Sequence, residues 1–299
     1  MIAEHRWWLN TRVPEDVAYI YRLTDRYPEF FKVLAKPMGA PDRVGYAIWQ
    51  YMSDCTEPDT MYLRLDDDIC YIAEDAIRQM RDFRLHHREP LLVLGNIVNN
   101  AICTHYQQQA GVVPKSWGLV GKDCMDERGW KSGPFARRVH RRFLKDLASG
   151  REEHWKNTAF PYEGDTRFSV SAICWFGDDF REIPELGASN IDEEPFMTAV
   201  LPARMGRPNM ICPRALFGHY AFCTQRAFLE TTSPEILAHY RRLAEQAAPM
   251  NGYALSPWEH SVLRVRRLWG VTGWAAQQSV AAAGAAYRTG KQRLRSRAA

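Results

Sequence analysis

The sequence of 299 residues predicts an α/β protein with a mixed, mostly parallel sheet flanked by helices and with a helical C-terminal extension. Apolar strand-like runs alternate with helix-like segments through roughly the first hundred residues, as expected of a parallel sheet. A composition that is 46% hydrophobic and 12% aromatic supplies enough apolar surface for a large core. Carboxylates that follow one of the apolar runs predict a ligand site at a strand end.

The first elements alternate as a parallel sheet requires. We expect a strand over residues 6–11 and a helix from about Pro14, since proline fits the first turn of a helix. The following segments are expected to be a strand at 30–34, a loop at 36–45, a helix at 46–51 and a strand at 61–65.

The later elements are less regular. The predicted segments are a helix at 75–83, strands at 90–96 and 167–176, a basic helix late in the stretch 111–157, and a helix at 233–248. We therefore expect residues 1–248 to form one domain.

Residues 249–299 are predicted to be a basic, Ala-rich helical tail. After Glu259 the chain has eight Lys or Arg and no Asp or Glu, so the basic charge of the protein lies in this tail. Contact with an anionic membrane surface or with nucleic acid would use such charge. A helix that packs on the domain and frays at a basic end explains the same pattern.

The seven cysteines include no CxxC pair and mostly lie within apolar runs. They are expected to be reduced core residues, with no structural zinc site among them.

No apolar run reaches the length of about 18 residues that a membrane span needs, and the N-terminus lacks a signal-peptide pattern. We expect a cytoplasmic protein, peripheral at a membrane if the tail binds one.

Three consecutive carboxylates separate two apolar runs in the stretch YLRLDDDICYI, residues 62–72. Like charges held close together repel one another, and burying them without partners is costly, so this position calls for a cation. A divalent metal is the first candidate. An acidic turn whose aspartate caps the following helix is the alternative that the residues leave open.

These aspartates, with other strings in the chain, resemble glycosyltransferases of the Rossmann-like GT-A fold. The aspartates match the DXD motif, NIDEEPF at 190–196 is similar to the acidic element of inverting members, and ALFGHYAF at 215–222 contains a lone histidine after it. WLNT at 8–11, NIVNN at 96–100 and RFSVSAICWFGDD at 167–179 extend the resemblance. It covers roughly residues 7–232 and excludes the tail.

The resemblance implies a metal site and a catalytic base. Asp68 would bind Mn²⁺ or Mg²⁺ directly, Asp66 would bind the metal, a metal-bound water or the ribose, and His219 would be a further ligand. Glu194, or else Glu193, would deprotonate the acceptor hydroxyl. Ordinary structural roles explain the same residues: a lone histidine in an apolar run is often a hydrogen-bonded core residue, and acidic residues favour a helix N-terminus.

The nucleotide-sugar donor would be contacted by a set of polar side chains near predicted strand ends. The members of this set are Asn10, Thr11, Arg64, Asp66, Asp67, Asn96 and Asn100. Turn chemistry explains the asparagines and the threonine equally well. The acceptor is left open among glycans, lipids, proteins and modified nucleic acids.

One feature departs from the GT-A pattern, because the first strand-like segment resembles the second strand of that fold. The usual first strand would then be missing, which weakens the case for a complete base-binding pocket.

Two other functions stay open. One is a phosphohydrolase of the haloacid dehalogenase kind, which also uses Asp-x-Asp after a strand. It would draw later acidic residues from Gly177-Asp178-Asp179, but Cys70 departs from its motif. The other is a sugar- or nucleic-acid-binding module without turnover.

Overall fold

The computed structural model describes residues 2–11, 13–36, 48–156, 160, 163–164, 166–186 and 192–247. The chain divides into residues 1–236 and 237–299, with the boundary inside helix α10 (Pro234–Ala247). The tail at 249–299 and most of the loop expected at 36–45 lie outside the described residues. Within the described ranges, no helix combines the length and apolar character that a membrane crossing needs.

The N-terminal part is a strand-helix-strand unit. It consists of β1 (His5–Leu9), α1 (Pro14–Arg26) and β2 (Phe31–Ala35). The two strands pair in parallel, with His5 opposite Phe31 and Leu9 opposite Ala35. Pro14 occupies the first turn of α1, as its fixed φ angle allows. The expected strand, helix and second strand are confirmed here.

The larger sheet has six strands and a mixed topology. Its order is β3-β7-β5-β8-β4, with β6 paired to β8. The strands are β3 (Met61–Leu65), β4 (Ile69–Ile72), β5 (Val93–Val98), β6 (Glu163–Gly164), β7 (Ala172–Phe176) and β8 (Asn209–His219). Among its described pairs, β5 with β8 is parallel and the rest are antiparallel. The α/β class is confirmed, but the prediction of a mostly parallel sheet is wrong.

The three aspartates form a turn that joins opposite edges of this sheet. The N–H of Ile69 donates to the carbonyl of Asp66 at 3.2 Å, which closes the turn. On one side the N–H of Asp66 donates to the Ser171 carbonyl just before β7, and on the other the N–H of Tyr220 donates to the Asp68 carbonyl just after β8. The turn therefore crosses from β7 to β8, between the end of β3 at Leu65 and the start of β4 at Ile69.

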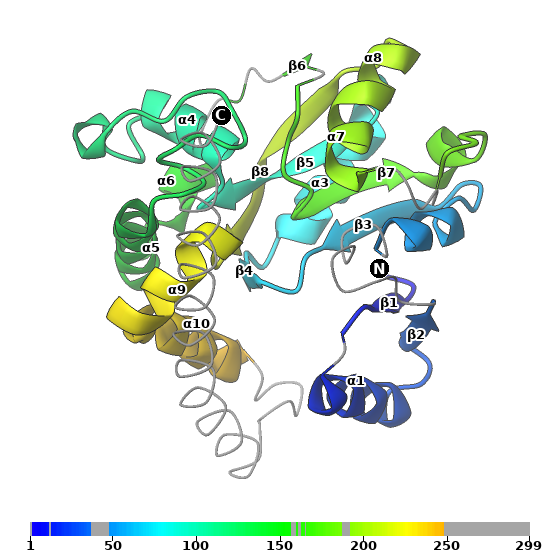
Figure 1. Ribbon diagram of the computed structural model, residues 1–299, viewed down its shortest axis with the longest axis horizontal. Helices are drawn as coiled ribbons and strands as arrows, with labels where there is room; N and C mark the ends of the chain where they lie inside the picture. Colours follow the sequence, from blue (N-terminus) through cyan, green and yellow to red (C-terminus); the bar gives the residue numbers. More distant parts are fainter. Residues whose placement is uncertain are drawn as a thin grey trace, which may run out of the picture. The chain divides into compact units, whose positions relative to one another are not determined.

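Helices cover the sheet on both sides (Figure 1). They are α3 (Ala76–His86), α4 (Ala101–Gln109), α5 (Gly133–Ala148), α6 (Glu152–Lys156), α7 (Glu193–Pro195), α8 (Leu201–Met205) and α9 (Cys223–Thr232). A π-helical turn, Phe196–Val200, joins α7 to α8. Helices α5 and α9 lie side by side, with Gly133 against the ring of Phe228.

The core positions the end of β8. Every residue of β5 is buried, and β7 is buried throughout. Gly218 in β8 lies against β4 so closely that a Cβ there would stand 2.9 Å from the Cβ of Tyr71. A glycine is needed for this approach, which brings β4 and the residue after Gly218 next to the aspartate turn.

Candidate functional site

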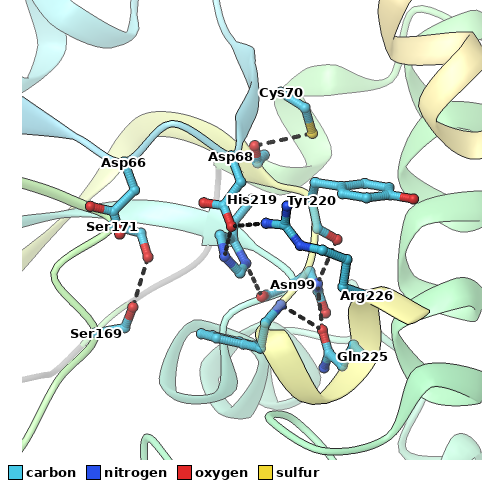
Figure 2. Close-up of polar contacts among 12 residues, drawn as sticks. Asp66, Asp68, Cys70, Asn99, Ser169, Ser171, His219, Tyr220, Gln225 and Arg226 are labelled. Carbon is cyan, nitrogen blue, oxygen red and sulfur yellow. Dashed lines mark hydrogen bonds and ion pairs between the residues drawn. The ribbon is translucent and has the colours of Figure 1, made fainter. Parts of the chain in front are cut away.

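The turn holds Asp68 against His219. Asp68 Oδ2 lies 3.4 Å from His219 Nε2, and the two side chains are 18% and 4% exposed. Figure 2 shows both side chains between the turn and the end of β8. Asp68 and His219, two of the three expected metal ligands, are thus in contact although 151 positions separate them in the sequence.

Asn99 fixes the orientation of the His219 ring. Its carbonyl oxygen lies 3.2 Å from His219 Nδ1, so Nδ1 donates to this carbonyl and Nε2 faces Asp68. Asn99 has a φ of 62°, a left-handed conformation that asparagine tolerates better than most residues. Its side-chain amide donates to the Tyr220 carbonyl and to Gln225 Oε1, at 3.1 and 3.0 Å. Asn99, itself held by two hydrogen bonds, therefore keeps the imidazole of His219 in one orientation.

Arg226 is a residue of the site that the sequence did not predict. Its Nη2 lies 2.9 Å from Asp68 Oδ2, and its side chain is 46% exposed. Arg226 lies in the first turn of α9, the helix that follows β8 and His219. A cation that opens a helix soon after the candidate histidine is the signal that could have indicated it.

The carboxylates of the turn differ in pKa because their partners differ. Burial alone would raise the pKa of Asp68, but the hydrogen bond from His219 and the charge of Arg226 outweigh it and lower the pKa. The pKa of the exposed Asp67 is raised, first by partial burial and then by repulsion from Asp68 and Asp66. Negative charge is thus incompletely balanced here.

Arg64 binds two carboxylates beside the turn. Its guanidinium pairs with Asp66 Oδ1 at 3.0 Å and with Glu193 Oε1, and its Cζ lies 5.7 Å from the Trp8 ring centre. The Arg64 side chain is only 8% exposed, so its role is to link β1, β3 and α7. Asp66 is occupied by this pair and stands apart from the Asp68 group in Figure 2. The structure therefore does not assemble Asp66 as a third metal ligand.

The two glutamates of α7 have different surroundings. Burial raises the pKa of Glu193 to about 7 even though Arg64 opposes the shift. Glu194 is 26% exposed, pairs with Arg167 Nε at 2.7 Å, and also has a raised pKa, chiefly from burial. A π-helical turn follows directly, a rare feature that is common at functional sites. Glu194 is thus the glutamate that an external hydroxyl can reach.

Several expected donor contacts have structural roles instead. Asn96 is fully buried, donates to the carbonyls of Trp155 and Pro213, and accepts from Gln107. Asn100 is the N-cap of α4 and accepts from the Cys103 N–H at 3.1 Å. Neither asparagine side chain is available to a ligand, which corrects the expectation from sequence.

The first strand ends in local turn chemistry. Thr11 Oγ1 accepts from the Val13 N–H at 3.1 Å and pairs with Asp16 at 3.2 Å ahead of α1. Asn10, beside it, also has a partner. Both residues follow β1, whose Trp8 contacts Arg64, so this end of β1 belongs to the region around the turn. Their expected contact with a nucleotide stays a prediction.

Asp178 and Asp179 lie at the other end of the β3–β7 pair. The strands run antiparallel, with Met61 opposite Phe176 and Leu65 opposite Ala172. The pair of aspartates after Phe176 is therefore separated from Asp66 by the length of β3. An arrangement in which both acidic elements serve one phosphoryl site therefore does not fit the fold.

The residues at the turn suit a hard divalent cation. Carboxylate oxygen and imidazole nitrogen are ordinary ligands of Mg²⁺ and Mn²⁺, and Asn99 leaves the ligating nitrogen of His219 directed at Asp68. In the described part of the chain, no cluster of three or more His, Cys, Asp or Glu side chains could hold a metal. A metal here would take its remaining ligands from water and from a bound substrate, as Mg²⁺ usually does with phosphates.

Comparisons with models of protein families, with curated proteins and with solved structures find no match to this chain.

Proposed function

We propose that the protein is a metal-dependent, inverting glycosyltransferase of GT-A type that transfers a sugar from a nucleotide-sugar donor to an acceptor hydroxyl. The observation that carries the proposal is the contact of Asp68 with a histidine whose ring a backbone carbonyl orients. A partner that fixes one ring nitrogen and leaves the other directed at a carboxylate is the usual arrangement around a metal-binding histidine.

Glu194 supplies the second part of the proposal. It lies on the first turn of α7, close enough to Asp66 for their charges to interact, and it is partly exposed. A raised pKa suits a carboxylate that must accept a proton near neutral pH. Donor and base would then lie on one side of the sheet, beside the ends of β3 and β8.

The reaction follows from these positions. Glu194 would accept the proton of the acceptor hydroxyl while the hydroxyl oxygen bonds to the anomeric carbon from the face opposite the leaving group. The bond to the nucleoside diphosphate breaks, and its electrons leave with the diphosphate. A bound Mn²⁺ or Mg²⁺ would neutralise the charge that develops there. Asp68 and His219 would hold this ion, and Arg64 would keep Glu193 and Asp66 neutralised beside it.

The first experiment is a calorimetric screen of nucleoside diphosphates and nucleotide sugars, with and without Mn²⁺. We expect one nucleotide to bind only with metal, and Asp68→Asn to weaken that binding by at least about a hundredfold, since even a supporting partner of a metal ligand is worth roughly ten- to a hundredfold. Asp178→Asn is the matched control, because it removes an aspartate at the far end of β3, where Asp178 accepts from the Asp59 N–H.

The outcomes separate the possible functions. Metal-dependent binding that survives Asp68→Asn would contradict the metal assignment. Binding of a sugar acceptor with no binding of any nucleotide would instead favour a module without turnover. Failure of every nucleotide to bind in the presence of Mn²⁺ would overturn the glycosyltransferase proposal.

A further inference from the structure

Arg226 already occupies the neighbourhood that a metal would enter. Its Nη2 lies 2.9 Å from Asp68 Oδ2, and His219 Nε2 lies 3.4 Å from the same oxygen. Metal ions bind carboxylate oxygen at about 2.0–2.2 Å, so an ion held by Asp68 and His219 would stand against the guanidinium. Two cations that close repel each other strongly in a partly buried site. One of them has to leave.

Arg226 is the group that can move. The Asp68 main chain is held by the Tyr220 N–H, and the His219 ring is held by Asn99. Asp68 and His219 are 18% and 4% exposed, whereas the Arg226 side chain is 46% exposed. Arg226 lies on the first turn of α9 and not on a strand, so its long side chain can change its torsion angles without moving the sheet.

We propose that Arg226 holds Asp68 in the metal-free protein and moves to the oxygens of the diphosphate when Asp68 and His219 take up the metal. A diphosphate bound to that metal lies within reach of a guanidinium that starts beside Asp68. Arginine donates two parallel hydrogen bonds to phosphate oxygens, which makes it a suitable partner. This inference rests on the proposed function, and it adds a residue that couples metal binding to diphosphate binding.

The coupling has a defined direction. Without Arg226, the metal alone should bind more tightly, because no cation competes for Asp68 Oδ2. The diphosphate should bind more weakly, because the released guanidinium no longer receives it. A purely structural ion pair predicts neither change, and loss of support for Asp68 would weaken both ligands together.

The test uses the full-length protein, Mn²⁺ followed by electron paramagnetic resonance, and inorganic pyrophosphate titrated calorimetrically at saturating Mn²⁺. For Arg226→Gln we expect Mn²⁺ alone to bind about two- to fivefold more tightly, the effect of removing a partly exposed ion pair. Pyrophosphate should bind about tenfold more weakly, as expected when a charged hydrogen bond is lost. Arg226→Lys keeps the charge without the paired donors, so Mn²⁺ affinity should stay near wild type while pyrophosphate still binds more weakly.

Arg141→Gln is the matched control, because Arg141 is 56% exposed and pairs with Glu235 on the surface. It should bind both ligands as the wild type does. If Asp68→Asn loses Mn²⁺ binding while Arg226→Gln matches the wild type in both titrations, the inference is overturned and the proposed function stands. If the wild-type protein binds neither Mn²⁺ nor manganese pyrophosphate, both are overturned.

Discussion

The two ends of the β3–β7 strand pair use the same residue types but pair them differently. At the end next to the aspartate turn, carboxylates outnumber the guanidinium groups that face them. At the other end, Asp179 pairs with both Arg84 and Arg207, and Arg88 lies over the Phe176 ring. At the first end carboxylates outnumber the guanidinium groups, whereas at the second a single carboxylate, Asp179, has two arginine partners.

The arginines at the second end have structural roles. Arg84 is fully buried and also donates to the His87 carbonyl, while Arg207 donates to the carbonyls of Glu89 and Pro90. Those donors fasten α3 and the start of β8 to the sheet. At the turn, Asp68 shares one oxygen between Arg226 and His219 and remains partly exposed. Unbalanced, accessible carboxylates at a strand end leave room for a cation from solution.

The largest expected effect is on turnover at the carboxylate-rich end. Glu194→Gln should lower the rate by about a hundred- to ten-thousandfold, the range for loss of a general base, and should leave nucleotide affinity unchanged. Transfer of the sugar to water from the nucleotide sugar that binds gives a rate without knowledge of the acceptor. Glu194→Gln with wild-type turnover would remove Glu194 from the mechanism.

Glu193→Gln provides the comparison on the same helix turn. Glu193 is buried and paired with Arg64, so its loss leaves a buried guanidinium with one partner fewer. We expect this variant to be less stable to urea while its folded fraction keeps a measurable turnover. The contrast between the two glutamates, rather than either variant alone, identifies the base.

At the arginine-rich end the expected effect is on stability. Arg84→Met should lower the free energy of unfolding by about 3 kcal/mol, since removing one partner of a buried ion pair typically costs that much. Urea denaturation measures the loss, and Mn²⁺ binding by the folded protein should not change. Arg204→Met, which breaks an exposed pair with Glu185, is the control and should leave the free energy of unfolding nearly unchanged. Equal losses in the two variants would contradict the structural role of Arg84.

A smaller effect should appear with pH, again at the carboxylate-rich end. Burial lowers the pKa of His140 from 6.5 to about 4, and its ring is hydrogen-bonded to the Tyr220 carbonyl beside His219. The unfolded chain binds the proton more readily, so stability is intact above about pH 6.5 and is lost as the pH falls toward about 4. Between about pH 7 and about pH 5 this group should cost about 2 kcal/mol.

Urea denaturation across this pH range tests the prediction, with His140→Gln as the variant that cannot titrate. The difference in pH dependence between the two proteins isolates the contribution of His140 from that of the carboxylates. Identical pH dependence would show that the ring titrates near its ordinary pKa.

Local patterns predicted the early elements well. Met61–Leu65 is a strand with the expected bounds, and Pro14 begins the first helix as expected. The strand β8 was missed because Pro213 and Arg214 interrupt its apolar run. The sheet accommodates them at an irregularity, where the partners of Gly95 and Asn96 jump from Cys212 to Leu216. A break that looks like a loop in the sequence is thus a bulge in a central strand.

The direction of the strands in the larger sheet could not be predicted from the sequence, for a different reason. Alternation of strands with helices predicts parallel pairing only if neighbours in the chain are neighbours in the sheet. Here β3 pairs with β7, and the aspartate turn carries the chain across to β4 at the opposite edge. The site shows the same limit: motif order suggested that Asp68 and His219 belong together, but the contact of Asp68 with Arg226 depends on how α9 leaves β8. Such contacts follow from tertiary packing, which no local pattern encodes.

The position of β8 also governs the order in which the protein can assemble during synthesis. Among the described strands β8 is the last to be made, yet it lies inside the sheet, between β5 and β4. Within that part of the chain β4 has no other strand partner, so β4 can pair only after β8 has been synthesised. The strand that closes the sheet also delivers His219 to Asp68. The contact of Asp68 with His219 therefore forms only when the fold is nearly complete.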